Sequence, residues 1–129
     1  MIKEHIFPLQ IYPQDTDMFG MIHHANHIKF MERARSGWLL DRGVDLVELF
    51  NKEIYFVVHS INIKYLKPIF FNDKIEIVTI VKHMGRVSME FIQIFRSQKN
   101  KEIIYCEADI KIACLDKNSK PHVINFINK

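Results

Sequence analysis

The sequence predicts an α+β fold in which one long helix packs against an antiparallel sheet of five strands. Two observations support this prediction. Apolar residues recur with helical spacing in residues 24–43, and four later segments alternate apolar and polar residues, as half-buried strands do. A helix placed beside such a sheet buries the apolar face of the sheet, which is the usual α+β arrangement.

The first expected strand covers residues 5–12, where Pro8 and Pro13 favour an edge or an end position. A loop over residues 13–22 follows and leads into the helix. In the helix, apolar residues fall at steps of three, three and four: Ile28, Met31, Ala34 and Trp38. The segment 24–43 would form about five turns at about 3.6 residues per turn. Gly43 can end it in a left-handed conformation.

Four further strands are predicted by alternation with a period of two. It is clearest in the last segment, where the apolar positions are Ile104, Cys106, Ala108, Ile110, Ile112 and Cys114. The other segments are 54–67, 74–82 and 87–96. Short turn-forming breaks separate these strands, so we expect them to be joined mainly as antiparallel neighbours. Several outward positions remain apolar, and self-association would cover them: Val78, Ile80, Ile92 and Ile94.

Length and composition limit the possible functions. The 129 residues, 48% of them apolar, predict a single domain over 1–129. The 18 Lys and Arg residues are dispersed among 15 Asp and Glu residues, so nucleic-acid binding is not indicated. No segment has the roughly 18 consecutive apolar residues of a spanning helix, and residues 1–10 lack the pattern of a signal peptide. We expect a soluble, cytoplasmic protein.

The two cysteines are expected to be reduced core residues. Cys106 and Cys114 lie eight residues apart in one predicted strand, too far to form a disulfide. Neither belongs to a CxxC pair, so a structural zinc site is not predicted.

Residue types that take part in catalysis are concentrated in residues 15–27, at the junction of loop and helix. They are Asp15, Thr16, Asp17, Gly20, His23, His24, Asn26 and His27. The start of a helix presents unpaired N–H groups and a partial positive charge, which can stabilise an oxyanion. A carboxylate on the entering loop can stand beside a carbonyl bound there.

The run YPQDTDMFGMIHHANHIKFMERAR resembles the signature of the 4-hydroxybenzoyl-CoA thioesterase family, and within it the Tol-Pal-associated acyl-CoA thioesterases. FVVHSINIKYLKPIFFNDKIEI and MGRVSMEF are similar to later segments of that group. The resemblance implies a hot-dog fold, in which the sheet wraps around the central helix. It also implies a homodimer that assembles into a homotetramer, with the active site between subunits.

The resemblance also implies roles for individual residues. Asp17 matches the catalytic acid, acting as nucleophile or as general base, and His24 matches the histidine at the helix start, where a backbone N–H forms the oxyanion hole. Asp15 matches an acid that is not the nucleophile. The other expected substrate contacts are Gly20, His23, Asn26, His59 and Ser60. The substrate would be an acyl-CoA or an acyl carrier protein thioester, with no cofactor beyond the coenzyme A of the substrate and no metal.

Three residues depart from the subgroup's usual pattern: His23 and His27, where Tyr is usual, and His59, where Arg is common. These three differences would affect which acyl group the site prefers and how it contacts coenzyme A. Glu32 and Arg35, three residues apart on the helix, are expected to form a structural ion pair.

Three alternatives remain open from the sequence. The histidines at 23, 24 and 27 could bind a divalent ion together with Asp17. A hot-dog dehydratase is disfavoured because its His-Phe-Pro-Gly type of motif is absent. A non-catalytic acyl-binding or scaffold protein associated with the cell envelope is the alternative from another functional class.

Overall fold

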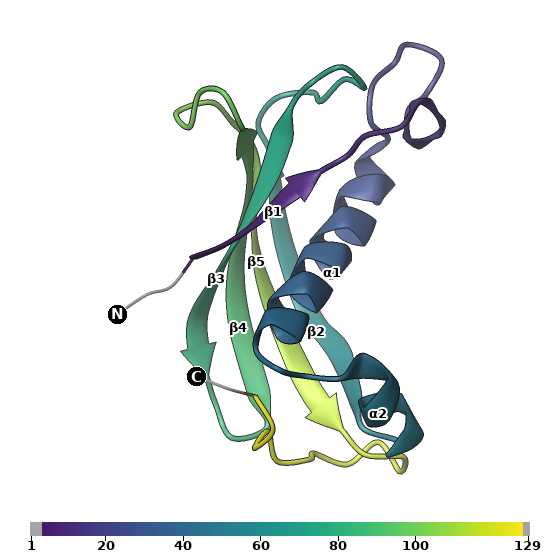
Figure 1. Ribbon diagram of the computed structural model, residues 1–129, viewed down its shortest axis with the longest axis vertical. Helices are drawn as coiled ribbons and strands as arrows, with labels where there is room; N and C mark the ends of the chain where they lie inside the picture. Colours follow the sequence, from purple (N-terminus) through teal and green to yellow (C-terminus); the bar gives the residue numbers. More distant parts are fainter. Residues whose placement is uncertain (1–3, 128–129) are drawn as a thin grey trace.

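A computed structural model describes residues 4–127 of the chain, so the ends of the expected domain 1–129, residues 1–3 and 128–129, lie outside the described residues. One long helix lies along one face of a curved five-stranded sheet (Figure 1). The elements in chain order are β1 (Glu4–Leu9), the 3-10 turn η1 (Pro13–Asp15), α1 (His24–Asp41), α2 (Leu46–Asn51), β2 (Tyr55–Tyr65), β3 (Ile75–Met84), β4 (Ser88–Ser97) and β5 (Ile104–Leu115). The expected hot-dog arrangement is confirmed.

The strand order in the sheet is β1-β3-β4-β5-β2, and every neighbouring pair is antiparallel. Short turns join β3 to β4 and β4 to β5, as expected. The expectation that β2 would neighbour β3 is wrong, because β2 pairs with β5 along Tyr55–Tyr65. Both β1 and β2 are therefore edge strands, and Pro8 lies on an edge as its missing N–H requires.

Helix α1 buries one face against the sheet and ends at Asp41, two residues before Gly43, whose φ of 78° is left-handed. Its buried residues are His27, Phe30, Met31, Ala34, Arg35, Trp38 and Leu39. The predicted apolar stripe is confirmed at three of its four positions. Ile28 is the exception because it is 40% exposed.

A polar network inside the core joins α1 to the sheet. The fully buried side chain of Gln93 on β4 donates to the carbonyl of Met31 at 3.0 Å and to the hydroxyl of Thr79 at 2.9 Å. Its own oxygen accepts from Arg35 Nη1 at 2.9 Å. The expected ion pair of Arg35 with Glu32 is wrong, because within residues 4–127 no contact of 4 Å or less joins their charged groups.

The sequence did not predict α2. Asp45 begins this short helix by accepting hydrogen bonds from the N–H groups of Val47 and Glu48 at 3.0 and 3.2 Å. On the outer face of the sheet, Val78 is buried, whereas Ile80, Ile92 and Ile94 remain partly exposed.

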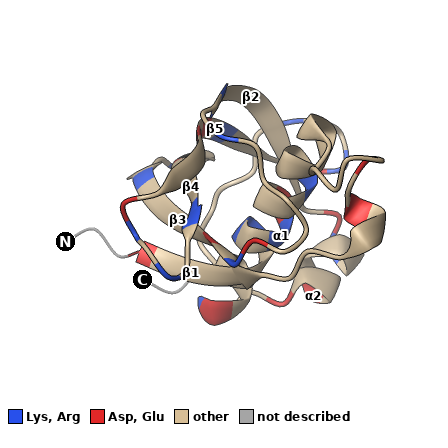
Figure 2. Cartoon of the chain, turned by 90° about the horizontal axis from the view of Figure 1, so that it is seen from above, with Lys and Arg blue, Asp and Glu red and all other residues tan. Residues whose placement is uncertain are grey.

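Charged residues of both signs are distributed over several elements (Figure 2). Among the described residues, none of the helices has the length and hydropathy needed to cross a membrane.

Candidate active site

Asp17 lies in a closed turn between η1 and α1. Its Oδ1 accepts hydrogen bonds from the N–H groups of Phe19 at 2.9 Å and Met21 at 3.2 Å. The backbone closes the same turn, because Asp17 N–H donates to Met21 O and Gly20 N–H donates to Asp17 O. Asp17 is exposed, and its Oδ2 has no hydrogen-bond partner within residues 4–127. One carboxylate oxygen is therefore held by the loop while the other is free to meet a substrate.

Gly20 makes this turn possible. Its φ of 75° is left-handed, and a Cβ atom built on it would lie 3.3 Å from Cδ1 of Phe71. Phe71 belongs to the connection between β2 and β3, and its N–H donates to Gly20 O at 3.0 Å. Met21 forms an isolated bridge with Phe70 of the same connection. The loop that carries Asp17 thus rests on a second segment that sequence reasoning did not assign to the site.

The first turn of α1 begins next to this loop. The side chain of His23 caps the helix, because its Nδ1 accepts from Ala25 N–H at 3.2 Å. The ring of His23 stacks on the ring of His24, with centroids 4.4 Å apart. Within the described residues, the N–H of His24 has no hydrogen-bond partner. An exposed donor therefore remains at the positive end of the helix, as an oxyanion site requires.

Asn26 ties the helix to the loop. Its side-chain N–H donates to the carbonyl of Asp15 at 2.8 Å, which links the first turn of α1 to the residue two positions before Asp17. The Asp15 carboxylate accepts from Tyr12 N–H at 3.0 Å and so stabilises η1. Asp15 is thus engaged in the local fold, and Asn26 fixes the position of the loop relative to the helix.

Two aromatic contacts that the sequence did not reveal come from the end of β2. The hydroxyl of Tyr65 donates to His24 O at 3.1 Å, and its ring meets the ring of His27 edge to face, with centroids 4.9 Å apart. His27 is buried between Tyr65 and Phe95, and burial lowers the pKa of its imidazole below the usual 6.5. A neutral His27 therefore packs as an aromatic residue.

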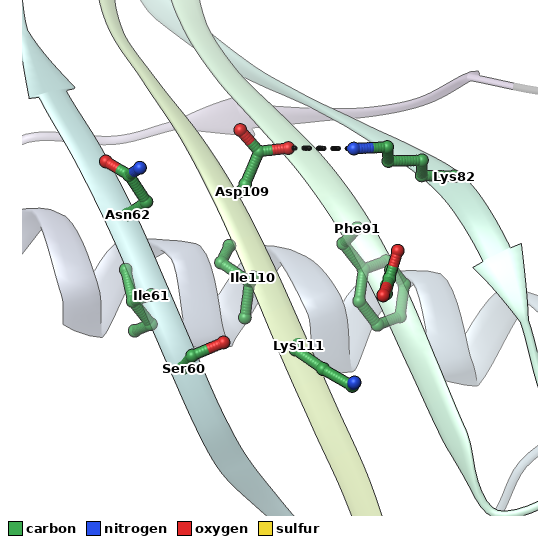
Figure 3. Close-up of a pocket in the computed structure, with 9 residues that line it drawn as sticks. Ser60, Ile61, Asn62, Lys82, Phe91, Asp109, Ile110 and Lys111 are labelled. Carbon is green, nitrogen blue, oxygen red and sulfur yellow. Dashed lines mark ion pairs between the residues drawn. The ribbon is translucent and has the colours of Figure 1, made fainter.

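The structure does not bring His59 and Ser60 to the Asp17 loop within one chain. His59 lies at a register irregularity of β2, between Val58 and Ser60. Figure 3 shows Ser60 beside Lys111 and Asn62 in a pocket on the outer face of the sheet, with α1 behind the strands. Ser60 is also five residues before Tyr65, which is about 16 Å along a strand.

The histidines do not form a metal site with Asp17 in this arrangement. Within residues 4–127 there is no group of three His, Cys, Asp or Glu side chains placed to hold a metal ion. His23 is engaged as the helix cap and His27 is buried. Cys106 and Cys114 are free and buried, and desolvation raises their thiol pKa values to about 12 and about 11.

Comparisons with known proteins agree on one family. The model of the thioesterase superfamily matches residues 19–104, a span that begins two residues after Asp17. The acyl-CoA thioester hydrolase YbgC of Escherichia coli O6:H1 is 30% identical over 110 residues, which cover 85% of this chain and 81% of that protein. The acyl-CoA thioesterase YbgC of Haemophilus influenzae is 30% identical over 113 residues, covering 85% and 79%.

Solved structures show the same fold. A probable thioesterase from Bartonella henselae superimposes with a TM-score of 0.81 at 26% identity, covering 94% of this chain and 97% of that one. A 1,4-dihydroxy-2-naphthoyl-CoA thioesterase from Synechocystis superimposes with a TM-score of 0.85 over 95% and 90% of the two chains, and at 13% identity it supports the fold alone.

Proposed function

Because the chain belongs to the thioesterase superfamily, we propose that it is an enzyme that hydrolyses acyl-CoA thioesters to the free acid and coenzyme A, as its YbgC relatives are named for doing. The observation that supports this most strongly is the free Oδ2 of Asp17, held on a closed turn that leads into α1, together with the N–H of His24 at the start of that helix, which has no hydrogen-bond partner within residues 4–127. An acyl carrier protein thioester presents the same bond and is a second form of substrate.

In the proposed mechanism the thioester carbonyl lies against the start of α1, where the N–H of His24 donates to its oxygen. Asp17 then acts in one of two ways. As nucleophile, its Oδ2 attacks the carbonyl carbon and the C–S bond breaks, which releases the coenzyme A thiolate to take a proton from solvent. Water then hydrolyses the mixed anhydride to the free acid and the Asp17 carboxylate. As general base, Asp17 takes a proton from the attacking water and later returns a proton to the leaving thiolate.

The other residues of the site have supporting roles in this proposal. Gly20 shapes the turn that holds Asp17, and Asn26 keeps that turn against the helix. The exposed rings of His23 and His24 border the entrance and contact the substrate. His59 and Ser60 would reach a substrate from the neighbouring subunit, since the chain's own Asp17 loop is remote from them.

The proposed active site therefore needs a dimer. Strand β2 is an edge strand of 11 residues, and its Val57 and Val58 are each 43% exposed. A long apolar edge strand has unpaired backbone N–H and C=O groups that can pair with a strand of another chain. We propose that two copies pair along β2 and that two such dimers form the tetramer. A Val57→Lys variant should shift the mass measured by light scattering towards the monomer, and an unchanged mass would contradict pairing at this edge.

We propose a cytoplasmic location, in line with the expectation from the sequence.

The decisive experiment measures thiol release from a panel of short, long and aromatic acyl-CoAs by the wild type and by Asp17→Asn. An asparagine can still accept the hydrogen bonds of Phe19 and Met21, so the turn should persist while the anionic oxygen is lost. We expect the rate to fall by at least about a hundredfold with an unchanged melting temperature. A parallel assay with a chelator tests the divalent-ion alternative.

A non-catalytic acyl-binding or scaffold protein is the competing function. It would bind acyl-CoA without releasing thiol from any member of the panel, and Asp17→Asn would leave that binding unchanged. Turnover that survives in Asp17→Asn would also overturn the proposed role of Asp17.

A further inference from the structure

A cavity of about 400 Å³ lies between α1, α2 and the inner face of the sheet. Most of its lining is apolar and includes Leu39, Leu46, Phe56 and Phe91. The volume is within the range of small-molecule sites, about 300 to 1,000 Å³. This cavity is formed by the later turns of α1 and is separate from the Asp17 loop at the start of the helix.

One cation, Arg35, and one carboxylate, Glu32, line this mainly apolar space. Arg35 is only 7% exposed, and the sole hydrogen bond of its side chain among the described residues is the one from Nη1 to Gln93. Gln93 is fully occupied by its other partners, Met31 and Thr79. Within residues 4–127, no carboxylate lies within 4 Å of the guanidinium.

The remaining N–H groups of Arg35 face the cavity. The buried polar atoms without a partner in the described chain are His5 Nδ1 and Trp38 Nε1, so Nε and Nη2 of Arg35 are not sealed inside the protein. Since Arg35 lines the cavity, the cavity is the space that these N–H groups reach. Burial lowers the pKa of the Arg35 guanidinium, and the charge of Glu32, which lies in the same cavity but more than 4 Å away, offsets this only in part. A desolvated guanidinium without a directly paired anion is costly, and a carboxylate in contact with it is its best partner because the two can form paired hydrogen bonds.

We propose that this cavity binds the acyl group of the substrate and that Arg35 pairs with a carboxylate at the far end of that group. The preferred substrates are then the mono-CoA thioesters of dicarboxylic acids. This inference rests on the proposed thioesterase function. Arg35 follows His24 by 11 residues, about 16 Å along the helix, so the acyl chain must extend along α1 from the thioester to the guanidinium.

Simple fatty acyl groups would fit this cavity less well. An apolar chain end would leave the guanidinium desolvated and unpaired, whereas a terminal carboxylate would neutralise it. A site built around a buried polar group discriminates strongly against ligands that cannot pair with it. The position of Arg35 therefore sets both the end group and the length that the substrate should have.

The test compares kcat/KM for straight-chain acyl-CoAs and for ω-carboxyacyl-CoAs of equal carbon number, over short, medium and long chains. For the wild type we expect a preference of at least about tenfold for the carboxylated substrate at one chain length. In Arg35→Met the ratio should fall towards one, and Arg35→Lys should keep part of the preference because it keeps the charge.

Arg35→Met also removes a partner of Gln93, so a second variant leaves that network intact. Leu46→Trp on α2 narrows the cavity and should lower the rate for long ω-carboxyacyl substrates more than for short ones. Val47→Trp is the matched control, because Val47 is 69% exposed on the same helix and does not line the cavity. It should behave as the wild type.

Binding of the free dicarboxylic acids, measured by calorimetry, gives a readout that does not depend on turnover. Binding that is weaker in Arg35→Met supports the inference, whether or not any thioester is cleaved. If thioesters are hydrolysed but neither the rates nor the binding favours a terminal carboxylate, the inference is wrong and the proposed function stands. If no thioester is hydrolysed, the proposed function fails, and the calorimetry alone decides whether Arg35 binds carboxylates.

Discussion

The hydroxyl of Tyr65 donates a hydrogen bond to the carbonyl oxygen of His24 at 3.1 Å. This bond joins the last residue of the edge strand β2 to the first residue of α1. The N–H of Ala25, on the other side of the same peptide, is bound by the ring of His23. With this peptide held on both sides, the preceding N–H of His24 is kept in one orientation at the start of α1.

Tyr65→Phe removes this hydrogen bond and keeps the aromatic packing on His27. We expect kcat for acyl-CoA hydrolysis to fall severalfold with little change in KM, because a less fixed His24 N–H stabilises the oxyanion less well. Steady-state kinetics would measure this, and Tyr55→Phe at the opposite end of β2 is the control. Equal kinetic parameters for Tyr65→Phe and wild type would show that Tyr65 does not position the helix start.

Gly20→Ala tests the turn that carries Asp17. A side chain at φ of 75° is strained by about 1 kcal/mol, and its Cβ would press on the ring of Phe71. The turn should shift, moving the N–H groups of Phe19 and Met21 away from Asp17, and kcat should fall. Thermal unfolding and kinetics together measure both effects.

The control for Gly20→Ala is Gly43→Ala, at the other end of α1. Gly43 has a similar φ of 78°, so its replacement should cost similar stability while leaving kcat near the wild-type value. If both variants lose activity in proportion to their stability, the effect at Gly20 is not specific to the site.

The sequence predicted the elements better than their arrangement. Local alternation is enough to identify a strand such as β5, and a glycine after the last helical residue marked the end of α1. The pairing of β2 with β5 depends on contacts between residues about fifty positions apart, which no local pattern encodes. The helix α2 was missed because its six residues are too few to show a helical period.

For the candidate site, too, the sequence identified the residues that are close together in the chain but not the distant residues that contact them. Residues 15–27 stood out as a cluster because they are consecutive in the chain. Tyr65 and Phe71 contact that cluster from more than forty positions away, and only the fold brings them there. Arg35 looked like the partner of Glu32, three residues away on the helix surface. The helix turns Arg35 into the core instead, where Gln93 accepts its hydrogen bond.

Gln93→Leu should destabilise the fold strongly. The change removes the acceptor of the Arg35 guanidinium and the donor to the hydroxyl of Thr79, and both groups are buried. Leaving buried polar groups unpaired costs about 1 to 3 kcal/mol each, so we expect a loss of about 3 kcal/mol in the free energy of unfolding. Urea denaturation measures it.

Gln98→Leu is the matched control for Gln93. The side chain of Gln98 makes a single hydrogen bond within residues 4–127, to the carbonyl of Ile75 at 2.7 Å, and is only partly buried. Its replacement should lower the free energy of unfolding by clearly less than Gln93→Leu does. Similar losses in both variants would mean that the buried network adds nothing beyond an ordinary surface hydrogen bond.

His27 should make the stability depend on pH. Burial, reinforced by the nearby His24, lowers the pKa of His27 in the folded state, whereas the unfolded chain has the usual value of 6.5. Between these two pKa values the unfolded state binds more protons, so the free energy of unfolding falls as the pH decreases below 6.5. Above 6.5 the imidazole is neutral in both states and makes no contribution to the pH dependence. Urea denaturation between neutral and mildly acidic pH should show this loss in the wild type.

His27→Tyr removes the titrating group and introduces the residue that the resembled subgroup usually has there. Its stability should therefore decrease less steeply with falling pH, since the ring packed between Tyr65 and Phe95 can no longer be protonated. His83→Gln, an exposed position on β3, controls for the general effect of removing a histidine. If the curves of wild type and His27→Tyr remain parallel across this range, another group is responsible for the acid sensitivity, and the burial of His27 carries no energetic consequence for protonation.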